Sequence, residues 1–284
     1  ISRAVHAFFG LLTIGMIPRS LGPNDFGNFT FLSIYFNRLF QLMDFSVSNA
    51  FFTKFSKNQS DKKLLSFRLL LFFITCSAVI IIVISIVNSK YHVLIFPDQN
   101  SKIILAILVY ALLNASLLIV RNVNDILGFT SKFELLVIIQ TILFSISIIC
   151  SFYLNKLNIN SYIILGSLSF LFLIFSGTIL FIKKSKIIWI DLKLSKQDFI
   201  GYSKDFFSFI KPLLLLSILG FISISLDRWL IQKFYGSVEQ GYFGIAEKIC
   251  GIVFLLTQSF LPLLQRELSV EIEKDNINNV KKLY

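Results

Sequence analysis

Polar residues recur at helical spacing inside a run of the chain that is otherwise apolar. Asn37, Gln41, Asp44 and Ser48 follow one another at intervals of four, three and four residues, with Arg38 beside them. This spacing predicts that the four lie on one face of a helix. A charge at the centre of a bilayer costs at least about 2.5–3.5 kcal/mol, so such groups normally face a cavity or one another. The pattern predicts a polar path through a membrane, to which Arg38 and Asp44 contribute charge.

Later apolar runs carry further polar residues, mostly near their ends. They are Tyr110, Asn114, Arg121 and Asp125 along one face of one run, Asp227 and Arg228 at the end of another, and Glu247 and Lys248 at the start of the next. We expect the charged members of this set to line the same polar path. The alternative is that these six charged side chains extend to the membrane surface and serve as interface anchors.

The composition excludes several classes of protein. The 284 residues are 55% hydrophobic and only 15% charged, which is too apolar for a soluble core of this size. The net charge of +11 resides mostly on loops, without the basic and aromatic stripe that binds nucleic acid. His6 and His92 have no companions at metal-ligand spacing, and Cys76, Cys150 and Cys250 lie inside apolar runs. We therefore expect no metal, no cofactor, no nucleic-acid partner and no enzymatic activity.

The apolar runs are about as long as a membrane is thick, and they recur along the whole chain. This predicts an all-α polytopic membrane protein, because continuous apolar runs do not alternate as barrel strands do. Eight transmembrane segments are expected, at 4–18, 28–50, 67–88, 102–121, 134–154, 162–182, 209–231 and 242–263. Pro18 is expected to close the first of them.

The basic residues of the loops predict the orientation of the chain. Counted over alternate loops, 18 Lys and Arg lie on one side and 5 on the other. Arg68 is assigned here to the basic loop that precedes the third segment. The positive-inside rule then places the N-terminus and the basic loops in the cytoplasm.

The connection over 183–208 is the longest. Ser195 and Asp198 have the spacing of a helix-capping box, and aromatic residues follow at helical intervals. This predicts an amphipathic helix on the cytoplasmic face that links two bundles, with lipid sensing or regulation as the alternative.

Two stretches of the chain resemble each other at an offset of 214 residues. IPRSLGPNDFGNFTF begins at Ile17, and IQKFYGSVEQGYFGI begins at Ile231. The matched pairs are Arg19 with Lys233, Gly22 with Gly236, Asp25 with Glu239, Gly27 with Gly241 and Phe29 with Phe243. Six segments separate the copies, so the repeat is parallel in the membrane, as in many transporters. The four glycines are expected to serve turns and helix packing.

These stretches also resemble a known family. RSLGPNDFGNFTF from Arg19, MDFSVSNAFFTKFS from Met43 and LDRWLIQKFYGSVEQGYFGIAEKI from Leu226 are similar to polysaccharide flippases of the Wzx type. Those proteins belong to the multidrug/oligosaccharidyl-lipid/polysaccharide exporter superfamily. The resemblance implies two six-helix lobes around a charged cavity, with twelve or more helices in all. It divides this chain into an N-terminal lobe over 1–182, the linker over 183–208 and the first two helices of a second lobe over 209–284, so we expect a truncated sequence.

The resemblance implies a function for the polar path. A member would flip a polyprenyl-pyrophosphate-linked oligosaccharide across the bacterial plasma membrane by alternating access, for polysaccharide or O-antigen biosynthesis. Its partners would be the lipid-linked oligosaccharide, membrane lipid and other proteins of polysaccharide assembly. The alternatives are a cation-coupled multidrug antiporter of the same superfamily and a membrane enzyme of polysaccharide assembly.

The orientation can be tested by cysteine labelling in a background without the three native cysteines. A cysteine introduced at position 92 should react with an impermeant reagent from outside the cell. One at position 186 should react only after permeabilisation, because the basic loops face the cytoplasm. The reverse pattern would refute the orientation.

Overall fold

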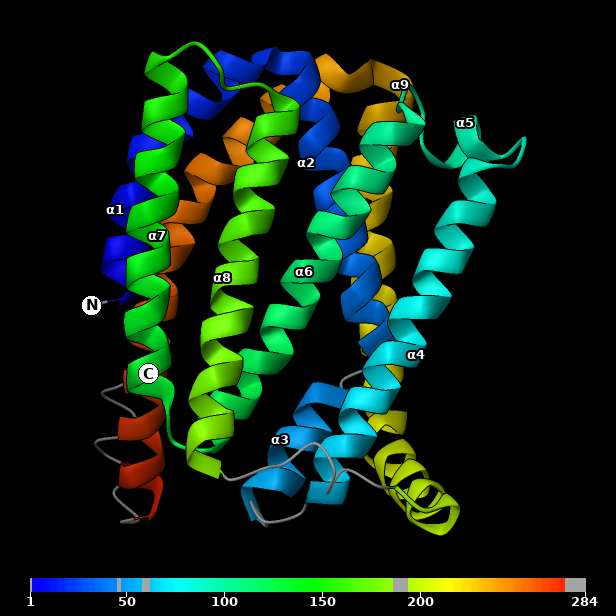
Figure 1. Ribbon diagram of the computed structural model, residues 1–284, viewed down its shortest axis with the longest axis vertical. Coiled ribbons are helices and arrows are strands. Elements are labelled where there is room, and N and C mark those ends of the chain that lie inside the picture. Colours follow the sequence, from blue (N-terminus) through cyan, green and yellow to red (C-terminus); the bar gives the residue numbers. More distant parts are fainter. Residues whose placement is uncertain (1, 45–46, 58–61, 186–193, 274–284) are drawn as a thin grey trace.

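The computed structural model describes residues 2–44, 47–57, 62–185 and 194–273, and every regular element within them is a helix. In chain order the helices are α1 (Ser2–Ile14), α2 (Met16–Asp44), α3 (Val47–Lys57), α4 (Lys62–Val87), α5 (His92–Ile95), α6 (Ser101–Ile126), α7 (Thr130–Tyr153), α8 (Ile159–Ser185) and α9 (Lys196–Glu273). The long helices run side by side between two ends (Figure 1). We call the end that contains α5 the α5 end, and the end that contains α3 and the start of α9 the basic end.

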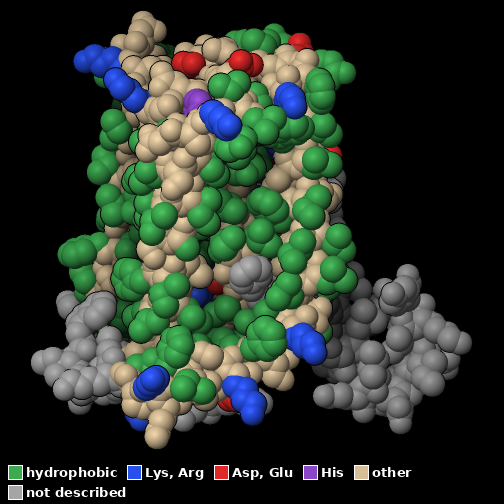
Figure 2. Space-filling view, turned by 90° about the vertical axis from the view of Figure 1, so that its right-hand side faces the viewer, with side chains coloured by type: hydrophobic (Ala, Val, Ile, Leu, Met, Phe, Trp, Pro, Cys, Tyr) green, Lys and Arg blue, Asp and Glu red, His purple; other side chains and the backbone are tan. Residues whose placement is uncertain are grey.

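Five of the described helices contain stretches long and apolar enough to cross a membrane. They are Lys63–Val87, Ser101–Ile126, Thr130–Tyr153, Ile159–Ile182 and Lys196–Gly251. In the most apolar 18-residue stretch of each of these helices, at most 33% is buried inside the protein. Large side chains such as Phe73 and Ile81 therefore point outward. Figure 2 shows one side of the molecule covered by hydrophobic side chains in its middle, with charged side chains gathered near the two ends. The protein is therefore an all-α multi-pass membrane protein.

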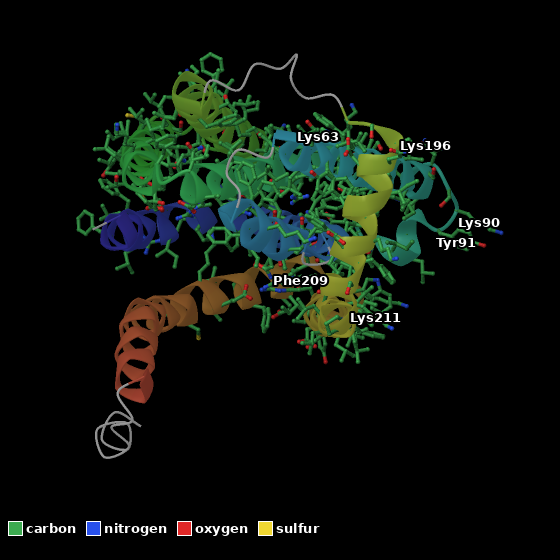
Figure 3. All side chains as sticks on the ribbon, turned by 90° about the horizontal axis from the view of Figure 1, so that it is seen from below. Lys63, Lys90, Tyr91, Lys196, Phe209 and Lys211 are labelled. Atoms are coloured by element: carbon green, nitrogen blue, oxygen red, sulfur yellow. The ribbon has the colours of Figure 1, made fainter. Side chains whose placement is uncertain are left out.

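The start of α9 packs against α3 and α4 at the basic end. Phe67 of α4 contacts the rings of Phe199 and Phe206, with centroid separations of 5.4 and 5.1 Å. Lys63 pairs with Asp198 at 3.0 Å, and Figure 3, seen from this end, shows Lys63 and Lys196 on the same edge of the bundle. The aromatic face of this segment is therefore covered by protein.

The predicted capping box at the start of α9 is confirmed. The Asp198 amide donates to Ser195 Oγ at 3.1 Å, and the Ser195 amide donates to Asp198 Oδ2 at 3.3 Å. These bonds satisfy two amides that a helix end would otherwise leave unpaired. Residues 186–193 of the predicted linker lie outside the described part of the chain.

The two aligned glycines of the repeat have the same unusual backbone. Gly22 has φ 75° and ψ 164°, and Gly236 has φ 84° and ψ −175°. A side chain is strained at such φ values, whereas glycine adopts them freely. In Figure 1 the chain reaches the upper end before each of these kinks and descends after it, in α2 and in the last part of α9. The two copies therefore run in the same direction.

The descending parts of the two copies cross in close, reciprocal contact. A methyl group built on Gly27 would overlap the carbonyl oxygen of Ser237, and one built on Gly241 would overlap that of Pro23. Pro23 and Ser237 are themselves matched at the offset of 214 residues, so each copy presents the same position to the other. A methyl group built on Gly244 would lie 3.1 Å from the side chain of Thr30, its own counterpart. Reciprocal contacts of this kind are typical of two units related by a two-fold axis. The small residues let the two helices approach closely.

One predicted segment boundary is wrong, that of the segment over 4–18. The segment over 28–50 includes residues 45–46, between α2 and α3, which lie outside the described part of the chain. The segment over 4–18 is divided at Gly15, and Pro18 lies in the first turn of α2, where its missing N–H group costs nothing. The last two predicted segments fall on either side of the kink at Gly236 within α9. Apolar runs indicate membrane-embedded stretches but do not show where the helices within them break.

The crossing predicts which glycines the fold requires. Gly27→Ala and Gly241→Ala should each destabilise the protein by about 1–3 kcal/mol, because the added methyl group overlaps a backbone carbonyl that cannot move aside. Gly251→Ala is the matched control, since among the described residues no atom lies within 4 Å of a methyl group there. The measurement is the midpoint of thermal unfolding in detergent, and equal midpoints for all three variants would contradict the close crossing.

Candidate functional site

A cavity of about 290 Å³ lies among α2, α3, α4, α6 and α9. Its polar lining consists of Asn37, Gln41, Asp44, Ser48, Asn49, Arg68, Thr75, Asn114, Asn122 and Ser217. The predicted polar stripe thus lines one cavity, although Ser48 belongs to α3 and does not share a helix with the other three. The arrangement holds many hydrogen-bonding groups together between membrane-spanning helices.

The charged centre of this cavity is an ion pair between α2 and α4. Arg68 Nη2 lies 2.5 Å from Asp44 Oδ1 and donates a second bond, of 2.9 Å, to Ser48 Oγ. Asp44 also accepts bonds from Ser48, at 3.0 Å from the amide and 3.2 Å from the hydroxyl group. Arg68 is only 4% exposed. A guanidinium group so deeply buried needs a counter-charge, and Asp44 supplies it.

Arg68 is the charged residue of this cavity that sequence reasoning missed. Its assignment to a loop is wrong, because α4 begins at Lys62 and Arg68 lies in its second turn. The available signal was its context, since Leu64, Leu65 and Phe67 precede it and are buried. An arginine flanked by apolar residues on both sides belongs to the apolar run and not to the loop.

A neutral amide pair adds to the polar wall of the cavity. Asn114 Nδ2 of α6 donates to Asn37 Oδ1 of α2 at 2.9 Å. This bond joins two helices between which an unpaired amide would be costly. A side-chain amide can exchange hydrogen bonds with sugar hydroxyl groups in both directions and can donate to phosphate oxygens, because it carries both donors and an acceptor.

Arg38 lies in a neighbouring cavity of about 200 Å³ between α2 and α9. Gln41 and Ser217 line both cavities. Arg38 Nη1 donates to Gln41 Oε1 at 2.8 Å, and this cavity is otherwise bounded by apolar residues and Gly220. The structure therefore gives Arg38 and Asp44 different partners, with Gln41 between the two cavities.

A second charged cluster lies within α9, on either side of its kink. Arg228 is 2% exposed, pairs with Glu247 and lies 4.5 Å from the ring centroid of Phe243. Lys248 lies over the ring of Phe26 at 4.8 Å. Asp227 is exposed. These residues, unlike Arg38 and Asp44, border neither of the two cavities described above.

The remaining predicted site residues are dispersed. Arg121 pairs with Glu134 of α7 and is 46% exposed, as expected for an interface anchor. Asp125 has one carboxylate oxygen buried without a hydrogen-bond partner among the described residues. In the repeat motif Arg19 and Glu239 are exposed, and Asp25 is half-buried. Lys233 lies over the ring of Trp229 at 4.4 Å.

A buried hydrogen-bond network joins the two copies of the repeat near the α5 end. Asn28 Oδ1 accepts bonds from Gln99 Nε2 at 2.7 Å and from Ser237 Oγ at 2.6 Å. Gln232 Nε2 donates to Ser237 Oγ at 2.8 Å and to the carbonyl oxygen of Pro97 at 3.2 Å. Sequence reasoning did not single out these residues. The bundle is thus tightly connected at the α5 end and contains its polar cavity toward the basic end.

Membrane-spanning helices around a polar, charged cavity define the class of protein: a multi-pass membrane protein with a hydrophilic site inside its bundle. In the described residues no cluster of three or more His, Cys, Asp or Glu is arranged to hold a metal ion. Comparisons of the chain with protein-family models, with curated proteins and with solved structures give no match.

The Arg228–Glu247 pair can be tested against the first copy of the repeat, which has Ile14 and Ser33 at the aligned positions. Glu247→Ser should destabilise the protein by about 3–5 kcal/mol, because it leaves a buried guanidinium group without a counter-charge. The double variant Arg228→Ile with Glu247→Ser should regain most of this loss. Thermal unfolding in detergent measures both effects. A double variant as unstable as the single one would show that the pair is not what Glu247 stabilises.

Proposed function

We propose that this protein flips a lipid-linked oligosaccharide, whose sugar is joined to a polyprenyl chain by pyrophosphate, across a bacterial plasma membrane. In this proposal the N-terminus and the basic end face the cytoplasm, and the product serves polysaccharide or O-antigen assembly. The observation that carries the proposal is the polar cavity around Arg68, Asp44, Asn37 and Asn114. A headgroup of this kind is both anionic and rich in hydroxyl groups, and the cavity offers a cation and neutral amides together.

The two arginines support the choice of headgroup. Arg68 lines one cavity and Arg38 lines the next, with Gln41 shared between them. A pyrophosphate carries two phosphate groups, and the planar guanidinium fork matches phosphate oxygens in pairs. Transfer through a medium of low dielectric is costly for such an anion unless cations accompany it.

The repeat supports an alternating-access cycle. The two copies contact each other at the Gly27–Gly241 crossing and through the Asn28 network near the α5 end, whereas the cavities lie toward the basic end. In alternating access the protein is closed at one end while it is open at the other, and a bundle that is closely packed at one end and hollow toward the other has this form. Paired units that move against each other are a common architecture for transporters.

Reconstitution into lipid vesicles tests the proposal directly. Vesicles that contain the protein should expose a polyprenyl-pyrophosphate-linked oligosaccharide to an impermeant lectin faster than protein-free vesicles do. Exchange of a lipophilic cation against Na⁺ or H⁺ without lipid movement would favour the antiporter instead. Covalent extension of the sugar would favour the enzyme of polysaccharide assembly.

A cell-based export assay tests the role of Arg38. Arg38→Ala should abolish polysaccharide export at normal protein abundance, because it removes a cation from the proposed headgroup path. Arg38→Lys should retain part of the activity, since it keeps the charge without the planar fork. Lys90→Ala, at an exposed position near α5, is the control and should leave export unchanged. Normal export by an abundant Arg38→Ala protein would reduce Arg38 to a surface anchor.

A further inference from the structure

Asp44 has two independent partners, and only one of them is an arginine. Besides Arg68, its carboxylate accepts a 3.0 Å bond from the Ser48 amide. This amide lies in the first described turn of α3, which runs from Val47, and its described partner is the Asp44 side chain. A carboxylate that accepts a charge-assisted bond from a backbone amide is stabilised without any cation. Asp44 would therefore keep a favourable position if Arg68 bound something else.

Arg68 has the opposite requirement. It is buried among membrane-spanning helices, where a guanidinium group without a counter-charge carries a large cost. Both of its described hydrogen bonds, to Asp44 and to Ser48, use the same Nη2 atom. It lines the larger cavity, so an anion that enters this cavity meets Arg68 and Asp44 together.

We propose that Asp44 is the resident counter-ion of Arg68 and that the diphosphate of a prenyl lipid displaces it. On binding, Arg68 turns to the phosphate oxygens, and the carboxylate of Asp44 remains on the first turn of α3. The charge of Arg68 is balanced before and after this exchange, which avoids an unpaired charge in the membrane. The inference rests on the proposed function and adds to it a competitor built into the site.

The competition has a measurable consequence. Asp44→Asn removes the negative charge, and the asparagine side-chain oxygen can still accept the bond from the Ser48 amide. The diphosphate then has no carboxylate to compete with for Arg68, and the affinity for a prenyl diphosphate should rise roughly tenfold or more. Release should slow in proportion, so that vesicles with this variant flip lipid more slowly than wild type despite binding it more tightly.

Equilibrium binding of radiolabelled geranylgeranyl diphosphate to the purified protein, at fixed ionic strength, provides the test. Wild type, Asp44→Asn, Arg68→Gln and the double variant form a cycle. Binding should tighten in Asp44→Asn and be lost equally in Arg68→Gln and in the double variant. Asp205→Asn removes a carboxylate at the same end that pairs with Lys54 outside the cavity, and it should bind as wild type does. Arg68→Lys replaces Arg68→Gln if the latter does not fold, and it should bind more weakly yet still respond to Asp44→Asn.

Inorganic pyrophosphate distinguishes the two sources of the anion. It should bind more weakly than the prenyl diphosphate, and tightening for pyrophosphate alone would overturn the lipid as the ligand. Unchanged binding in Asp44→Asn, or tightening that persists without Arg68, would overturn the counter-ion role. If Asp44→Asn tightens the binding of the diphosphate as expected but the wild-type protein flips no lipid, the proposed function is refuted and this inference stands.

Discussion

A charged side chain between membrane-spanning helices has little water to hydrate it, and the surroundings of Arg68 follow from that constraint. Its charge is balanced by Asp44, and Asp44 is held by the first turn of α3. The first described turn of α3 is thus part of the site, because the Ser48 amide donates to the carboxylate of Asp44. The polar cavity, this turn and the ion pair form one arrangement.

The two ends of the bundle are built by different means. Near the α5 end, glycines at the crossing of α2 and α9 bring the backbones together, and the network around Asn28 satisfies the polar groups there. Toward the basic end, the same two helices are separated by Arg38, Gln41 and Ser217 and by the cavities that these residues line. Close packing at one end and polar space at the other follow from side-chain size alone, since glycine permits a contact that arginine and glutamine prevent.

Apolar run length was sufficient to predict the helical class and the positions of α4, α6, α7 and α8, because a bilayer imposes a minimum length on every span. The bond from the Ser48 amide to Asp44 was not predictable in this way, since a contact between backbone and side chain does not depend on hydropathy. Arg68 was missed for a related reason: loop and helix differ there by a single turn. Helical spacing did identify Asn37, Gln41 and Asp44, whereas contacts between helices, such as Asn37 with Asn114, require the packing itself.

The crossing of the two copies constrains how such a sequence can diverge after duplication. Positions 27 and 241 each contact the backbone of the other copy, so a larger side chain at either one requires a compensating shift in a distant part of the gene. Away from the crossing this restraint is absent, and the second copy has Arg228 and Glu247 where the first has Ile14 and Ser33. Among relatives the glycines should therefore vary together or not at all, while the charges drift independently in each half.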